Sequence, residues 1–313
     1  MLGKTAGGLY WMFRYLERSE NTARLIETGF RIALTRPDSS EHEWSSVLDA
    51  VGERQTYQAT HDTFDQAQVI NFMLREKANP SCVMSVIEHA RNNARLVRTA
   101  LSREVWEATN ECYIQLKEVL SKPVPERDLP QVLGLIRQQS ALVRGALHGT
   151  MLRNDIFNFA RIGTFLERAD NTARILDVKY YVLLPSIGQV GSDLDNVQWE
   201  NVLRSVGGQR SFQWLTGGEV TPMGIAEFLL LDQRMPRSLA FCVSKIHSNL
   251  SYLEKEYRAR HSSQDMAEGM VGRLTSISIE QIFDGGLHEY VLNCLAQNAR
   301  LSQEIEQNYR FQE

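Results

Sequence analysis

The chain has 313 residues, of which 43% are hydrophobic and 23% charged, and its net charge is −4 with a sequence pI of about 6.0. This composition is typical of a globular protein, and the slight acidic excess does not favour nucleic acid or an anionic membrane as a partner. No apolar run approaches the roughly 20 residues that a membrane span requires, so we expect no membrane association.

Apolar residues recur at three-to-four-residue spacing along almost the whole chain, and β-branched alternation is scarce, which predicts an all-α fold. In the first half we expect helices over 6–35, 41–58, 62–77, 80–107, 108–121 and 128–148. In the second half we expect them over 153–184, 196–213, 222–233, 236–260, 266–282 and 284–311. Breaks are expected at "TRPDSSEHE", "KPVPERDLP" and "LPSIGQVGSDLD". Asn79 and Thr221 each precede a proline and are predicted to cap the helices that follow.

Three stretches of the first half recur in order in the second half. "YLERSENTARLIE" from Tyr15 matches "FLERADNTARILD" from Phe165, and "WSSVLDAVG" from Trp44 matches "WENVLRSVG" from Trp199. "VINFMLREKANPSC" then matches "IAEFLLLDQRMPRS". An ordered match of this kind indicates a tandem duplication. We therefore predict two related helical units, 1–150 and 151–313, packed as one pseudo-symmetric helical bundle.

The first matching segment places a carboxylate on an apolar helix face in each copy. At 100° per residue Glu20 falls within the face centred on Leu16, and Asp170 falls within the matching face of the second copy. A buried carboxylate is costly unless it is paired, and Arg24 and Arg174 follow four residues later, in the favourable order for an ion pair. We expect Glu20 and Asp170 to be mostly buried and to contact an arginine of the same or the other copy.

The remaining polar residues of the motif lie at the edge of the face or opposite it. Asn21 and Asn171 lie one turn from Glu17 and Glu167 and could hydrogen-bond to them. The candidates for ligand or partner binding are Glu17, Arg18, Glu20, Asn21, Arg24, Glu167, Arg168, Asp170, Asn171 and Arg174. Three interpretations stay open for this set: a structural network that fixes helix register, a polar pocket for an anionic or zwitterionic ligand or a partner, and direct catalysis.

Arg18 and Arg168 point away from the apolar face that holds the buried carboxylates. They are therefore not needed to neutralise Glu20 or Asp170, and either could reach a carboxylate or phosphate through bidentate hydrogen bonds. On this reasoning, Arg168→Lys should leave stability almost unchanged and weaken a partner-dependent activity.

Two further polar clusters supply secondary candidates, which are Arg153, Asp155, Arg161, Asp232, Arg234 and Arg237. At the break that holds the last three, the first half keeps an acid at Glu76 but has Ala78 and Ser81 opposite the two arginines. These clusters could be helix caps and solvated charge, or they could mark one half as specialised for a ligand or partner.

The sequence gives no sign of a metal, a cofactor or an activated nucleophile. The seven histidines have no metal-ligand spacing, and the Glu-x-x-His pairs of a di-iron bundle are missing. No phosphate loop and no serine or cysteine nucleophile motif is present. The four scattered cysteines fit a reducing compartment, and the first residues lack the apolar core of a signal peptide, so we expect a cytoplasmic protein.

"YLERSENTAR", "FLERADNTAR" and "FLLLDQRMPRSLAFC" resemble the bacterial alpha-E proteins, which are predicted all-helical proteins named for a Glu-Arg motif. The resemblance covers nearly the whole chain and identifies the Glu-Arg motif with positions 17–18 and 167–168. Phe157 stands where the family often has tryptophan. Family members are typically encoded beside, or fused to, a circularly permuted ATP-grasp protein, often with a transglutaminase-like protease.

The resemblance implies a role in an amide-ligation or peptide-modification system. The leading hypothesis is a non-catalytic accessory or binding subunit that works with a circularly permuted ATP-grasp ligase and contacts a peptide or amino-acid substrate. The alternative is a stand-alone enzyme that acts on amino-acid or peptide substrates through the Glu-Arg motifs. A structural dimerisation module is a third class. The absence of a nucleophile, metal or histidine motif favours the first hypothesis.

Overall fold

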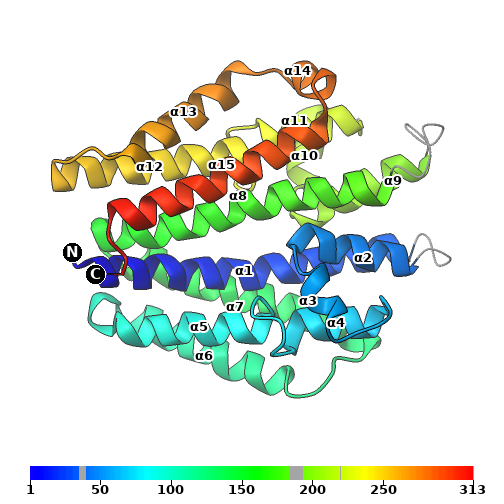
Figure 1. Cartoon of the computed structure of the whole chain (residues 1–313), viewed down its shortest axis with the longest axis horizontal. Coiled ribbons are helices and arrows are strands. Elements are labelled where there is room, and N and C mark those ends of the chain that lie inside the picture. The colour runs from blue at the N-terminus through cyan, green and yellow to red at the C-terminus, as the bar shows by residue number, and fades with distance from the viewer. Residues whose placement is uncertain (35–39, 184–192, 219, 313) are drawn as a thin grey trace.

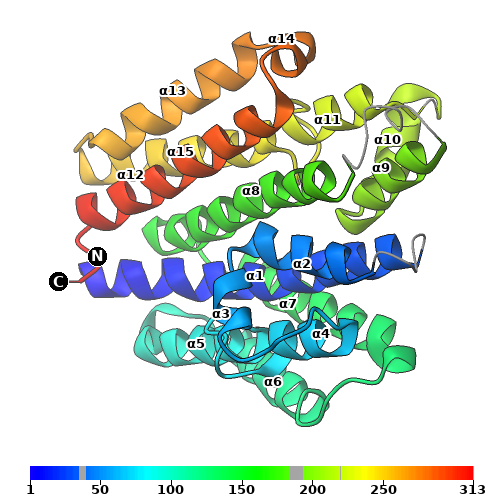
Figure 2. The ribbon, with the colours of Figure 1, turned by 45° about the vertical axis from the view of Figure 1, so that its right-hand side comes forward.

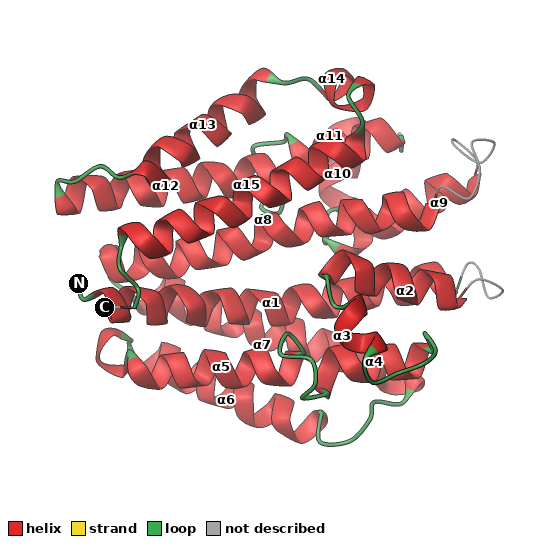
Figure 3. Cartoon of the chain, viewed as in Figure 1, coloured by secondary structure: helices red, strands yellow, loops and turns green. Residues whose placement is uncertain are grey.

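The computed structural model describes residues 1–34, 40–183, 193–218 and 220–312. Every regular element among these residues is a helix, which confirms the predicted all-α fold (Figure 3). None of the described helices combines the length and the apolar character needed to cross a membrane.

The helices follow one another with short connections. The first group is α1 (Gly3–Ala33), α2 (Ser40–Val51), α3 (Arg54–Gln58), α4 (Gln66–Arg75), α5 (Val83–Leu96), η2 (Arg98–Ala100), α6 (Arg103–Val119), η3 (Glu126–Asp128) and α7 (Leu129–Thr150). The second group is α8 (Asp155–Leu183), α9 (Asp193–Ser205), α10 (Gln209–Thr216), α11 (Pro222–Leu230), α12 (Leu239–Tyr257), α13 (Ser262–Ser276), α14 (Ile279–Asp284) and α15 (Leu287–Asn308).

The two motif helices, α1 and α8, lie side by side at the centre of the molecule (Figures 1 and 2). On its other sides α1 packs against α5 and α7, and α8 packs against α12 and α15. Helices α6 and α13 form the outer layers, α6 on α5 and α7 and α13 on α12 and α15. The N-terminus and the last described residues lie near the start of α1 (Figure 1). Each Glu-Arg motif therefore lies in the middle of the molecule.

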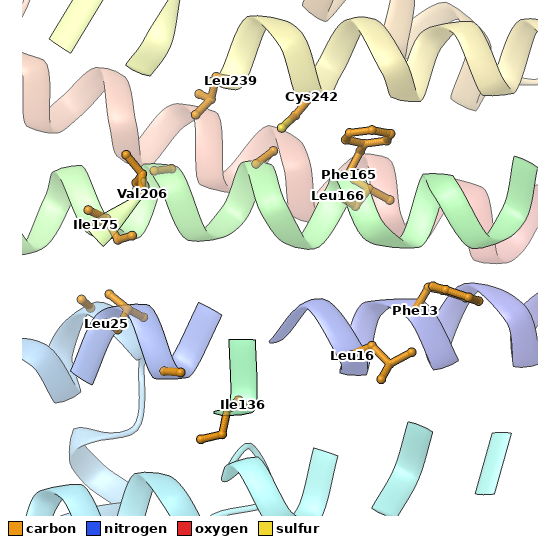
Figure 4. Close-up of a cluster of buried hydrophobic side chains, with 14 of the residues drawn as sticks. Phe13, Leu16, Leu25, Ile136, Phe165, Leu166, Ile175, Val206, Leu239 and Cys242 are labelled. Atoms are coloured by element: carbon orange, nitrogen blue, oxygen red, sulfur yellow. The ribbon is translucent and has the colours of Figure 1, made fainter. Parts of the chain in front are cut away.

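Helix α1 is buried on more than one side, as its apolar pattern predicts. Leu16 and Phe13 are at most 1% exposed, and Leu25, on another side of the helix, is 3% exposed (Figure 4). Such a helix is stabilised by burying apolar surface on every flank. The approach to α8 is close at Gly163, where a β-carbon would lie 2.2 Å from the carbonyl oxygen of Tyr10. Only glycine fits this crossing without movement of the backbone.

Each motif helix also contacts the second helix of the other half. Helix α2 packs against α8, and α9 packs against α1. Arg174 Nη1 donates to the carbonyl oxygen of Ala50 at 2.6 Å, and Arg24 Nη1 donates to that of Ser205 at 2.6 Å. These carbonyls belong to the last turns of α2 and α9, where backbone acceptors lack partners within the helix. The arginines thus serve as C-terminal caps supplied by the opposite half.

Several predicted helices are divided or shortened at glycines with positive φ. The predicted helices 41–58 and 196–213 each divide, after Gly52 (φ +75°) and Gly207 (φ +69°), and the predicted helix 284–311 begins only after Gly286 (φ +93°). Left-handed backbone of this kind favours glycine and ends a helix. The predicted helix 80–107 divides into α5, η2 and the start of α6, which begins at Arg103 and not at 108 as predicted, and the predicted helix 266–282 divides between α13 and α14.

One of the two predicted caps is confirmed and the other is wrong. Thr221 Oγ1 accepts from Gly224 N at 3.1 Å and caps α11. Asn79 Oδ1 instead accepts from Ser81 N at 2.8 Å, and α5 begins at Val83. The asparagine closes a local turn before the helix, a competing use of the same side chain. The predicted helix ends at 35 and 184 and most of the breaks at 35–43 and 184–195 lie outside the described residues.

Candidate functional site

The two Glu-Arg motifs exchange ion pairs between α1 and α8. Arg18 Nε and Nη2 lie 2.5 and 3.0 Å from the two carboxylate oxygens of Glu167. Arg168 Nε and Nη2 lie 2.9 and 3.0 Å from those of Glu17. Both pairs are bidentate, the geometry in which the guanidinium fork binds a carboxylate most strongly. Each of these two motif glutamates is thus paired with the motif arginine of the other central helix.

Glu17 is held by more than its motif partner. It is 1% exposed, and Arg144 Nη1 and Arg237 Nη1 lie 3.1 and 3.2 Å from its oxygens in addition to Arg168. Burial by itself raises the pKa of Glu17, but the charges of Arg168, Arg144 and Arg237 outweigh it and hold the pKa below its ordinary value. Glu17 is therefore an anion across the physiological pH range.

Glu20 is buried and paired, as predicted. It is 1% exposed, and Arg24 Nη2 lies 2.8 Å from Oε1 within the same helix. Arg144 Nη1 lies 2.5 Å from Oε2, and Arg237 donates to Oε1. Burial and the neighbouring Glu17 raise the pKa of Glu20, but the opposite effect of the three arginines is larger. The pKa is therefore lowered, and the carboxyl stays ionised.

The carboxylates of the second motif have fewer arginines around them. Glu167 is 5% exposed and accepts from Arg14 Nε at 2.9 Å in addition to Arg18. Burial raises its pKa, and Arg18 and Arg14 lower it to about 2. Asp170 pairs with Arg174 at 2.6 Å, which confirms the predicted contact, but its side chain is 23% exposed and thus only partly buried.

The hydrogen bonds that Asn21 and Asn171 could make to the glutamates one turn away are not formed among the described residues. Asn21 Nδ2 donates to the backbone oxygen of Glu167 at 3.1 Å, and Asn21 Oδ1 accepts from Arg237 Nη1 at 3.4 Å. Neither polar atom of the Asn171 carboxamide has a hydrogen-bond partner within the described residues, although the side chain is buried. The difference between the asparagines matches the difference between Arg237 and Ser81 at the corresponding positions.

Arg18 and Arg168 are both engaged in ion pairs. The Arg168 side chain is 11% exposed, and Nη1 also donates to the Pro236 carbonyl at 3.3 Å. Arg18 is more open, with 27% of its side chain exposed, but it too is committed to Glu167. The expectation that Arg168→Lys leaves stability unchanged therefore no longer holds.

Of the secondary candidates before the second motif, Arg153 and Asp155 make structural contacts and Arg161 does not. Arg153 donates to the carbonyls of His148 and Met151, and Asp155 accepts from the Tyr257 hydroxyl at 2.8 Å. These contacts hold the start of α8 in place. Arg161 differs, because no ion pair reaches it among the described residues and its buried Nε has no hydrogen-bond partner there.

Of the secondary candidates around the break before α12, Asp232 and Arg234 pair with each other and Arg237 does not join them. Asp232 and Arg234 form a local ion pair at 2.9 Å, which closes the turn. Arg237 instead reaches into the motif cluster and is 6% exposed. Burial, only partly offset by Glu17, lowers its pKa to about 10. Of this group the structure brings only Arg237 to the motifs.

Sequence reasoning missed two members of the cluster, Arg14 and Arg144. Arg14 lies one turn before Arg18, and a search for further cations on the same helix could have found it. Arg144 belongs to α7, and its contacts with Glu17 and Glu20 span more than 120 positions of the chain. No local pattern in the sequence signals such a contact.

At least three cavities adjoin the motifs among the described residues. One of about 480 Å³ lies among α8, α12, α13 and α15 and is lined mainly by apolar side chains. A second, of about 230 Å³, is lined by Arg18, Asn171 and Arg174, among others. A third, of about 200 Å³, lies between α7 and α8 and includes Arg168. Arg18 and Arg168 are thus paired on one side and face a cavity on another.

The described residues hold no group of three or more histidine, cysteine, aspartate or glutamate side chains placed to bind a metal ion. Burial raises the pKa of the Cys112 and Cys242 thiols to about 12 and that of Cys294 to about 11. These thiols are protonated at neutral pH, and a thiol in this state is a poor nucleophile.

No curated protein and no solved structure matches the chain. A family model described as a predicted alpha-helical domain with a conserved ER motif matches residues 1–309. The Glu-Arg pairs at 17–18 and 167–168 form the reciprocal ion pairs between the two central helices. The match covers all but the last four residues, and the chain therefore belongs to the Alpha-E family.

Proposed function

We propose that the protein consists of two tandem, related helical units, 1–150 and 151–313, that form one pseudo-symmetric body. Three matching sequence segments support this proposal. Within each half the central helix packs against two later helices, α1 against α5 and α7 and α8 against α12 and α15, and each central helix also packs against the second helix of the other half, α9 or α2. The carbonyl contacts of Arg24 and Arg174 also correspond, because Ser205 and Ala50 occupy matching positions.

We further propose that the protein is an accessory or binding subunit of an ATP-grasp amide-ligase system that modifies peptides, rather than a catalyst. The observation that carries this proposal is the state of the motif carboxylates. Glu17 and Glu167 are buried, each is held by at least two arginines, and the pKa of each lies far below neutrality. A general acid or base works best when its pKa lies near the operating pH.

The choice of partner rests on family membership, since the Alpha-E resemblance implies a circularly permuted ATP-grasp ligase. In this proposal the protein acts in the bacterial cytoplasm, where it would hold a peptide or amino-acid acceptor or help to assemble the ligase. The rigid, cross-linked centre would keep surface sites on both halves in a constant relative position.

The proposal is tested by co-expressing the protein with a circularly permuted ATP-grasp ligase from the same genome. We expect the two to co-purify and ligase turnover to rise when the protein is added. If they do not associate and turnover is indifferent to the protein, the proposal fails. Turnover by this protein alone, abolished by Glu17→Gln in a folded variant, would instead establish the stand-alone enzyme.

A further inference from the structure

A small cavity between α7 and α8 is lined by an unusual concentration of basic side chains. Its volume is about 200 Å³, and its polar lining residues are Arg144, His148, Arg161, Thr164 and Arg168. No acidic side chain lines this cavity among the residues that the structure describes. Arg144 and Arg168 reach it from the motif cluster, whereas Arg161 and His148 belong to none of the ion pairs described above.

Arg161 is the residue that the fold does not explain. Its guanidinium lies 5.4 and 5.1 Å from the ring centres of Phe157 and Phe165. Aromatic faces attract a cation, but they supply no counter-charge. Its Nε is buried, and no hydrogen-bond partner for it is present within 1–34, 40–183, 193–218 and 220–312. A partly buried cation without a counter-ion is costly, so a protein that keeps one has a use for it.

The neighbouring ion pairs do not neutralise this region. Two carboxylates of the motif cluster, Glu17 and Glu20, are shared by four arginines, which are Arg24, Arg144, Arg168 and Arg237. Arg161 adds a further positive charge. Burial, and then the charges of Arg153 and Arg168, lower the pKa of Arg161. Burial, and then Arg161, lower the pKa of His148. Burial and the neighbouring positive charges act in the same direction on both groups.

We infer that this cavity is an anion site that takes a phosphoryl group, with Arg161 as its principal donor. The planar guanidinium fork matches the geometry of phosphate oxygens. A water molecule occupies roughly 30 Å³ of liquid, so the cavity has room for a phosphoryl group and a few attached atoms. The excess of more than one positive charge favours a doubly charged phosphoryl group over a carboxylate. The inference does not depend on the proposed ligase.

The inference is tested by measuring thermal stability and calorimetric binding at constant ionic strength with inorganic phosphate, phenyl phosphate, acetate and chloride. We expect saturable binding and stabilisation by the phosphates and much weaker effects of acetate and chloride. Tighter binding of phenyl phosphate would identify an organic phosphate monoester as the occupant. Tighter binding of inorganic phosphate would identify the free ion.

Arg161→Gln should weaken phosphate binding by at least about tenfold, because the variant loses the donor that lacks a protein partner. Arg127→Gln is the matched control, since it removes the same charge from a side chain that is 85% exposed, and it should bind phosphate like the wild type. Arg161→Lys keeps the charge without the fork and should bind with intermediate affinity.

Arg161→Gln is expected to fold and to be at least as stable as the wild type without phosphate, because the charge that it removes is partly buried and has no counter-ion among the described residues. Phosphate affinity that survives Arg161→Gln would overturn the inference. Equal stabilisation by phosphate and chloride, or by phosphate and acetate, would overturn it as well.

Discussion

Arg168 illustrates how a buried carboxylate commits the arginine that faces it. From the sequence, this arginine points away from the apolar face and should be available to a ligand. In the structure its Nε and Nη2 hold both oxygens of Glu17, and the side chain is 11% exposed. A buried carboxylate without a partner is costly, and the guanidinium group of Arg168 is one of the groups that pair Glu17.

Arg168→Lys should lower the free energy of unfolding by about 1–3 kcal/mol, because a lysine cannot reproduce the two parallel hydrogen bonds to a buried partner. Urea unfolding followed by circular dichroism measures this change. The matched control is Arg103→Lys, where the side chain is 80% exposed and pairs with Glu107 one turn away. The control should change stability by less than about 0.5 kcal/mol. Equal effects of the two variants would contradict the prediction.

Glu167 should make stability depend on pH in the acid range. Its folded-state pKa is lowered from 4.5 to about 2, so its charge contributes stability above pH 4.5, and this contribution is lost as the pH falls towards 2. The stability difference between the wild type and Glu167→Gln should therefore be largest above pH 4.5 and shrink below it.

Urea unfolding of both proteins at a series of pH values measures the difference. Glu88→Gln, at an exposed position, should stay close to the wild type throughout. A difference between the wild type and Glu167→Gln that stays constant down to pH 2 would argue against the predicted role of the Glu167 charge.

At the scale of helices, the approach of α1 to α8 sets the geometry of the ion pairs. Gly163 allows this approach, since the Tyr10 carbonyl oxygen lies only 2.2 Å from the place that a β-carbon would take. Gly145 in α7 offers a contrast, because a β-carbon added there would meet nothing within 4 Å among the described residues. A side chain is therefore excluded at Gly163 and has room at Gly145.

Gly163→Ala should destabilise the protein by about 1–3 kcal/mol, because the added methyl group forces α1 and α8 apart. Gly145→Ala should instead stabilise it by up to about 1 kcal/mol, because alanine is the better helix former. Thermal unfolding of both variants measures the effects. Should Gly163→Ala also stabilise the protein, the close crossing described here would be wrong.

At the scale of the whole molecule, each half completes the other. The motif glutamates of one central helix are paired by arginines of the other, and α2 and α9 each pack against the central helix of the opposite half. Arg24 and Arg174 reach the last turns of these helices. Separating the halves would leave several buried charges and backbone carbonyls without partners.

We therefore expect unfolding in urea to occur in a single transition. Buried tryptophans, Trp44 in the first half and Trp199 in the second, report on both halves through fluorescence, and circular dichroism reports on helix content. Coincident curves indicate one cooperative unit. Two separated transitions would show that the halves unfold independently, contrary to this prediction.

How far the sequence predicts this protein depends on the range of the interaction. The all-α class, the position of both motif helices and the pairs Glu20–Arg24 and Asp170–Arg174 follow from spacing of three to four residues, which local helix geometry controls. Helix ends were less predictable, because Gly52 and Gly207 interrupt apolar patterns that continue on either side. Whether these glycines adopt a left-handed backbone depends on how the flanking helices pack.

The sequence by itself determined that two motif helices each carry a carboxylate that must be paired. Only the tertiary structure decided which further arginines surround these carboxylates, because Arg144 and Arg237 reach Glu20 from segments far along the chain. It also decided that Arg168 is committed and Arg161 is not, although both are arginines of α8. A helix specifies the direction in which a side chain points, but the charge it meets there depends on the surface that packs against it.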